Sequence, residues 1–282
     1  MSRYRSHRSL GLRALVRHLH RWSKKHFSDR KHHGQQKITD AMLIALQLTR
    51  LFYKHPYASI WWEFLRETRR ALPSYTQAYT RTQRLLPVLE ALAMPSKRLC
   101  TVLIDSEPLP VCRDKRAKRC KFKEAGRPGR CRSAQDAAWG YGTQGDFYGF
   151  KLHAWVSKTG EVVQYVIRPA NFHDVTIAYE LNRRWPEFGG PKIVGDKRPG
   201  PGGAVLAKTG YTCLGFVTPP KKNAKHDTGW DEKLHGPMRK RIETVFSQFA
   251  QQHIRWGQVK TQTALRLRVV LTVLAHNLSL QA

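Results

Sequence analysis

The sequence predicts an α/β protein with a mainly helical N-terminal region. Apolar residues recur at helical spacing between residues 38 and 94, whereas from residue 99 onward short apolar runs alternate with helical stretches. Two of those runs end in an aspartate, Asp105 and Asp196, although the chain has only 20 acidic residues. We expect three parts, a basic N-terminal arm, a helical module and an α/β core, at residues 1–35, 36–98 and 99–282.

The N-terminal arm is strongly basic and contains one acid, Asp29. Apolar residues recur in it at helical spacing, namely Leu12, Leu15, Val16, Leu19 and Trp22. Part of the arm is therefore expected to form an amphipathic helix with a basic face. Membrane-surface helices and calmodulin targets share this pattern, but the charge of the whole chain favours contact with DNA.

Three helices are expected in the helical module. Thr39 or Asp40 can cap the first, residues 60–71 form the second, and Pro73-Ser74 opens the third. The third helix carries Tyr, Gln and Arg at exposed positions. This arrangement suits a helix-turn-helix-like DNA-binding module, and it suits plain helical packing equally well.

Strands and helices follow a definite order in the core. Strands are expected at 100–105, 147–156, 161–168, 192–196 and 211–218, and helices at 174–184 and 237–252. The second and third strands form a hairpin through Lys158-Thr159-Gly160. This order fits an RNase H-like layered domain, in which the first strand is central and the fourth lies beside it.

The composition indicates a polyanionic partner. The chain has 50 Lys and Arg against 20 Asp and Glu, a formal net charge of +30. No apolar stretch reaches the roughly 20 residues of a membrane span, and residues 1–13 lack the apolar core of a signal peptide. We therefore expect an intracellular protein that binds nucleic acid and no membrane.

Three acids are candidates for one metal site. Asp105 and Asp196 are expected at the ends of neighbouring central strands, and Glu243 lies in the basic helical stretch 239–246. A buried carboxylate costs desolvation free energy that a divalent cation offsets. Two Mg²⁺ or Mn²⁺ ions on these carboxylates would activate water and stabilise the leaving oxygen in phosphodiester cleavage.

Basic residues beside these acids are candidate DNA contacts, although each has the alternative of a solvated surface charge. They are Lys151, His153, Lys197, Arg239, Lys240 and Arg241. The five cysteines are irregularly spaced, which argues against a disulfide framework. Cys112, Cys120 and Cys131 with His153 are an alternative zinc site.

Several strings in the chain resemble DDE-type insertion-sequence transposases, most closely the insertion sequence 982 family. They are Ile104-Asp105-Ser106-Glu107-Pro108-Leu109-Pro110-Val111-Cys112, Tyr148-Gly149-Phe150-Lys151-Leu152-His153, Arg168-Pro169-Ala170-Asn171-Phe172-His173-Asp174, Gly195-Asp196-Lys197 and Arg241-Ile242-Glu243-Thr244-Val245-Phe246-Ser247-Gln248. The resemblance implies an RNase H-like catalytic core, a DNA-binding N-terminal part, two divalent metal ions and cut-and-paste movement of a mobile element. It puts Asp105, Asp196 and Glu243 at the family's catalytic positions. It also implies a bacterial protein of the cytoplasm, associated with the nucleoid, that binds double-stranded DNA.

The resemblance also has a local exception. Family members usually continue Gly-Asp-Lys with Gly-Tyr, whereas Lys197 is followed here by the Pro- and Gly-rich segment 198–203. We expect a transposase that binds the terminal inverted repeats of its element and catalyses strand cleavage and strand transfer, as a homodimer on paired ends. The alternatives are a metal-dependent nuclease of the same fold and an inactive, transposase-derived DNA-binding protein.

Overall fold

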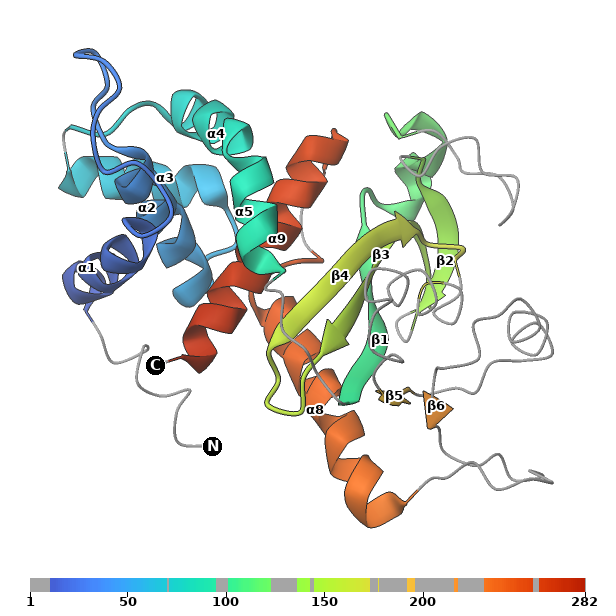
Figure 1. The fold of residues 1–282 in the computed structure, drawn as a ribbon. Helices are drawn as coiled ribbons and strands as arrows, with labels where there is room; N and C mark the ends of the chain where they lie inside the picture. Colours follow the sequence, from blue (N-terminus) through green and yellow to red (C-terminus); the bar gives the residue numbers. More distant parts are fainter. Residues whose placement is uncertain are drawn as a thin grey trace. The chain divides into compact units, whose positions relative to one another are not determined.

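The contacts within the chain divide it into a helical unit and a sheet unit. The helical unit comprises residues 1–93, 248–256 and 263–282, and the sheet unit comprises residues 94–247 and 257–262. The computed structural model describes residues 11–69, 71–94, 101–122, 136–142, 145–172, 177, 192–195, 216–217, 231–255 and 259–281. Figure 1 shows the helices and strands along the chain.

The helical unit is built from short helices and one long one. They are α1 (Leu12–Ser23), α2 (Asp40–Phe52), α3 (Ala58–Thr68), α4 (Tyr75–Arg84), α5 (Leu86–Ala93) and α9 (Gln262–Leu280). The expected first, second and third helices of the module correspond to α2, α3 and α4. The described part of the chain contains no helix that is both long enough and apolar enough to cross a membrane.

The starts of α2 and α4 follow from local capping chemistry. The Thr39 hydroxyl accepts a hydrogen bond from the Met42 backbone N–H at 3.2 Å, so Thr39 caps α2. Ser74 and Gln77 form a capping box at the start of α4, where each side chain accepts from the other residue's backbone N–H. Both starts confirm the boundaries expected from the sequence.

The helix expected in the basic arm forms, and it packs into the helical unit. Leu15, Val16 and Leu19 of α1 are buried, and Val16 shares a core cluster with residues of α2, α3 and α4. The division by contacts therefore differs from the predicted ranges, since α1 and α9 both belong to the helical unit. The functional assignment of those ranges stays a prediction.

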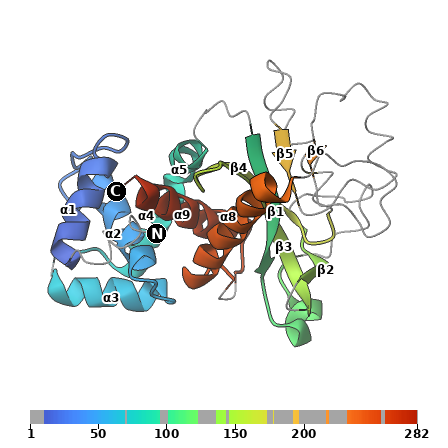
Figure 2. The same ribbon diagram turned by 90° about the horizontal axis from the view of Figure 1, so that it is seen from below.

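The sheet unit contains a mixed sheet with the first strand at its centre. Its described strands are β1 (Thr101–Pro110), β2 (Ala138–Gly142), β3 (Gly145–Val156), β4 (Val162–Pro169), β5 (Lys192–Val194) and β6 (Phe216–Val217). The order is β2-β3-β1-β5-β6, and β4 also pairs with β3 (Figure 2). The expected hairpin is β3–β4, and its turn includes Gly160 at φ +94°. The central place of β1 with β5 beside it confirms that part of the predicted topology, whereas β2 was not expected from the sequence.

One long helix follows the described strands. This helix, α8 (Glu232–Gln251), begins five residues before its expected start and has Pro237 within its second turn. A methyl group on Gly160 would lie 3.3 Å from the Arg241 Cδ and 3.8 Å from the Val245 Cγ2, so α8 packs on the β3–β4 turn. The helix expected at 174–184 lies outside the described residues except for Ile177, which is helical and buried.

Candidate active site

Asp105 lies in the middle of β1, and the prediction that it ends a strand is wrong. β1 continues to Pro110 because its antiparallel partner β3 stays paired with it as far as the Pro110–Gly149 pair. On its other side, the parallel pairing with β5 is described only as far as the Leu103–Val194 pair. Asp105 therefore lies just beyond the described β1–β5 pairing, while still held by β3.

The carboxylate of Asp105 is half-buried and anchored locally. Its Oδ1 accepts a hydrogen bond from the Ser106 backbone N–H at 2.8 Å. Ala154 lies directly opposite on β3 and presents only a methyl group to that face. The side chain is thus fixed on the central strand of the sheet unit beside a small residue.

Side-chain alternation along β1 separates the two faces of the sheet. Asp105 and Glu107 lie on one face, and Ile104 and Ser106 lie on the other. Ile104 belongs to a core cluster with Val102, Trp155, Val163, Val166 and the helical Ile177. The face opposite Asp105 is therefore a packed apolar face.

His153 lies on the packed face, which does not fit its predicted role as a DNA contact. It pairs with Ser106 across the strands, and its side chain is 0% exposed. A buried imidazole reaches no phosphate, so we withdraw His153 as a DNA contact. Lys151 occupies the same face two residues away and is half-buried beside Arg168 on β4.

Glu107 is an acid that the sequence analysis did not single out. It lies on the Asp105 face two residues further along β1 and is only 2% exposed. A carboxylate so deeply buried on the face of the predicted metal ligand belongs to the surroundings of the site. The signal was present in the sequence as an acid at i+2 from Asp105, the spacing that puts two strand residues on one face.

The second predicted acid, Asp196, and Lys197 lie outside the described residues. The preceding residue, Gly195, is described: its N–H donates to the Val217 carbonyl at 3.2 Å. A methyl group on Gly195 would lie 3.3 Å from the Ile104 Cγ2. Gly195 is therefore adjacent to the residue that precedes Asp105, and a larger side chain there would press on β1.

Glu243 lies on the exposed side of α8, one residue from its buried stripe. Ile242, Val245 and Phe246 are buried, whereas the Glu243 side chain is 56% exposed. Its Oε1 lies 3.4 Å from the Arg239 Nε, an i,i+4 ion pair along the helix. Lys240 and Arg241 are exposed on the same stretch, and the stem of Arg241 packs on Gly160.

A metal cluster is not apparent within the described part of the chain. There, no three His, Cys, Asp or Glu side chains lie together as metal ligands would. Because Asp196 is outside that part, the predicted set of Asp105, Asp196 and Glu243 stays a prediction. Two members of the alternative zinc set, Cys112 and Cys120, are both half-buried free thiols. Burial, with Cys120 nearby, raises the pKa of the Cys112 thiol to about 11.

The fold, the site and the comparison agree on the class of protein. A net charge of +30 favours a polyanionic partner, and Asp105 on the central strand of the mixed sheet offers the carboxylate oxygens that divalent cations prefer. The family model described as Transposase DDE domain matches residues 96–255, and the chain belongs to that family. The family's fold is RNase H-like, in agreement with the α/β sheet unit. No curated protein and no solved structure matches the chain. The narrower insertion sequence 982 family stays a prediction.

Proposed function

We propose that this transposase binds the terminal inverted repeats of its own insertion sequence and catalyses DNA strand cleavage and strand transfer there. The observation that carries the proposal is Asp105, a half-buried carboxylate on the central strand of the matched domain, just beyond the described β1–β5 pairing. Asp196 follows Gly195 directly in the sequence, and Gly195 lies against Ile104. This neighbourhood supports a shared site for the two aspartates.

The donor chemistry of the proposed site suits a hard divalent cation. Asp105, Asp196 and Glu243 offer carboxylate oxygens, which Mg²⁺ and Mn²⁺ prefer. Two such ions would supply an activated nucleophile and charge stabilisation at the leaving oxygen. The exposed Glu243 would exchange its ion pair with Arg239 for the metal, and Arg239 would stay beside the site, where a guanidinium can donate to a DNA phosphate.

The basic residues around the site are proposed to hold the DNA backbone. Arg239, Lys240 and Arg241 project from the same helix as Glu243, and Lys197 follows Asp196 in the sequence. Cations in this position contact phosphates and set the register of the duplex without reading its sequence. Lys151 is a weaker candidate, because it shares the face opposite Asp105.

The decisive experiment is cleavage of a duplex that carries the DNA flanking the gene, with Mg²⁺ or Mn²⁺. Asp105→Asn, Asp196→Asn and Glu243→Gln each remove a charged ligand and keep the side chain's shape, so each should abolish cleavage and strand transfer. Binding of the same duplex should change little. Chelation of the metal should have the same effect as the substitutions.

Asp146→Asn is a matched control, because Asp146 is an exposed aspartate on β3 of the same sheet. It should cut at the wild-type rate. A site variant that cuts as fast as Asp146→Asn is not a ligand variant, and its residue leaves the proposed set. Cleavage without strand transfer would favour the nuclease alternative, and binding without cleavage by the wild-type protein would favour the inactive DNA-binding alternative.

A further inference from the structure

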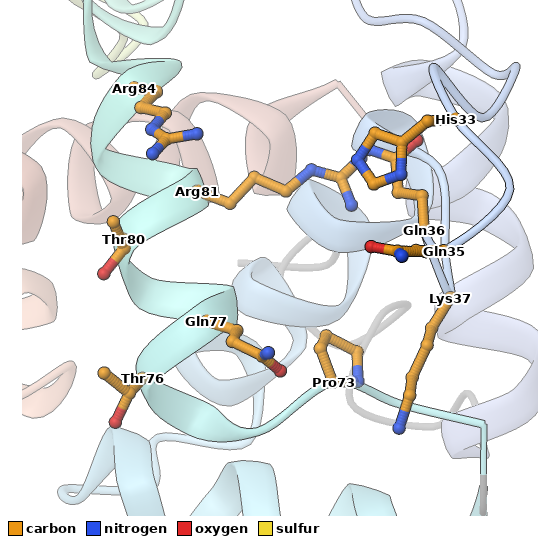
Figure 3. Close-up of a pocket in the computed structure, with 10 residues that line it drawn as sticks. All are labelled: His33, Gln35, Gln36, Lys37, Pro73, Thr76, Gln77, Thr80, Arg81 and Arg84. Atoms are coloured by element: carbon orange, nitrogen blue, oxygen red, sulfur yellow. The ribbon is translucent and has the colours of Figure 1, made fainter.

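A polar groove lies within the helical unit, apart from the carboxylates. It has a volume of about 460 Å³ and lies between α4 and the segment 33–37. Its lining residues are His33, Gln35, Gln36, Lys37, Pro73, Thr76, Gln77, Thr80, Arg81 and Arg84. Figure 3 shows the α4 residues on one side and the 33–37 residues on the other, with the Arg81 side chain extending between them.

The groove is cationic, and the described residues that line it include no acid. The nearest acid, Asp40, is buried and is already paired: its Oδ1 accepts from the Arg81 Nε at 2.6 Å, and its Oδ2 lies 3.1 Å from the His32 Nε2. Lys37 and Arg84 are exposed, and neither has an ion-pair partner among the described residues. The positive charge of the groove therefore faces outward, where it favours an anionic ligand.

Hydrogen bonds to neighbouring residues hold both walls of the groove in place. Arg81 also donates from Nη1 to the Ile38 carbonyl at 2.8 Å, which ties α4 to the end of the opposite wall. Gln36 accepts from the His32 backbone N–H at 2.6 Å. The Trp62 indole N–H donates to the Pro73 carbonyl at 2.9 Å, which fixes the turn before α4. A pre-organised groove loses little conformational entropy on binding.

The exposed face of α4 has the chemistry that reads base edges. Thr76, Thr80 and Arg84 are exposed at i, i+4 and i+8, while Ala78 and Thr82 face the core. Arginine contacts guanine through two hydrogen bonds, and threonine offers both a hydroxyl and a methyl group. A helix of 10 residues is roughly 15 Å long, and a single helix fits the major groove.

We propose that α4 enters the major groove of duplex DNA, with Thr76, Thr80 and Arg84 on base edges and Lys37 on a phosphate. The inference rests on the proposed transposase function. It assigns recognition of the element ends to the protein groove between α4 and the segment 33–37. Arg81 is held inside the unit by Asp40 and Ile38, so it supports the groove and makes no base contact.

The test uses the full-length protein and two duplexes of equal length, one from the DNA flanking the gene and one with the same bases shuffled. Arg84→Ala should lower the preference for the flanking duplex roughly 10- to 100-fold. Thr80→Ala should lower it by a smaller factor. Lys37→Ala should weaken the binding of both duplexes by the same factor. It should also make the salt dependence of binding shallower by about 0.9, because one phosphate contact is lost.

Arg66→Ala is the charge-matched control. Arg66 is an arginine on α3 whose side chain is 41% exposed; it pairs with Glu63 at 2.6 Å and does not line the groove. It should leave the preference unchanged. If Arg84→Ala and Thr80→Ala also keep the wild-type preference, the groove does not read DNA, while cleavage by the wild-type protein would leave the transposase proposal intact. A wild-type protein with neither preference nor cleavage overturns both proposals.

Discussion

Arg81 and Arg84 lie three residues apart on α4 and have different surroundings. Arg81 is paired with the buried Asp40, whereas Arg84 is exposed. The same residue type therefore has a structural role at one position and is available to a ligand at the other. Sequence reasoning identified basic residues on the third helix but could not separate these two roles, because the partner Asp40 is 41 residues away.

This difference predicts opposite consequences of two alanine substitutions. Arg81→Ala leaves the Asp40 carboxylate buried without its guanidinium and should reduce the free energy of unfolding by about 1–3 kcal/mol. Arg84→Ala should change it by less than about 0.5 kcal/mol. Urea unfolding followed by circular dichroism measures both. Equal losses at the two positions would contradict the assigned roles.

Gly149 lies in the segment 148–153 that resembles the transposase family, and the structure explains why a glycine is needed there. A Cβ at this position would lie 2.3 Å from the Leu109 carbonyl oxygen and 3.1 Å from the Pro110 Cα, which are both backbone atoms. Gly149→Ala should therefore force β3 away from the end of β1, at a cost of about 1–3 kcal/mol. Thermal unfolding checks the prediction, with Gly34→Ala as a control because nothing lies within 4 Å of its added methyl group. An unchanged melting temperature for Gly149→Ala would show that the strands separate freely there.

At the scale of helices and strands, capping residues and strand patterns predicted the helix starts and the strand order. Thr39 and Ser74 fixed the starts of α2 and α4, and the order of strands fixed β1 at the centre of the sheet. The sequence did not reveal α9, because every side chain from Val269 to Ser279 is buried and no polar face marks a helical period. It also placed Asp105 at a strand end, because the continuation of β1 depends on pairing with the distant β3.

Helix α1 offers a test of the basic arm that keeps its fold intact. Deletion of residues 1–33 would remove the buried Leu15, Val16 and Leu19, so it would damage the helical unit and would not test DNA binding by the arm alone. Arg13, Arg17 and Arg21 are exposed at i,i+4 spacing on the other face of α1. Their joint replacement by alanine should make the salt slope of DNA binding shallower by up to roughly 2.7, at about 0.9 per phosphate contact. An unchanged slope, with unchanged helical content, would remove α1 from the DNA interface.

At the scale of the whole molecule, 50 basic residues against 20 acidic ones are expected to attract DNA whatever its sequence. The charge attracts every duplex, so affinity alone does not report recognition of the element ends. Selectivity has to come from a small number of base contacts, and we propose that the chemical step depends on Asp105, Asp196 and Glu243. Substitutions are therefore expected to change affinity, sequence preference and cleavage independently of one another. The experiments on the α4 groove and on Asp105 depend on this independence.

The last prediction concerns assembly on DNA. Strand transfer of an element needs both of its ends at one place, and one chain carries one matched catalytic domain. Two chains of 32.6 kDa are therefore expected to hold two end duplexes in one complex. Light scattering after gel filtration, with the Asp105→Asn variant to prevent cleavage, measures the mass of that complex. A shuffled duplex should not yield the paired species. A particle with a single chain and a single duplex, from a protein that still performs strand transfer, would contradict the homodimer.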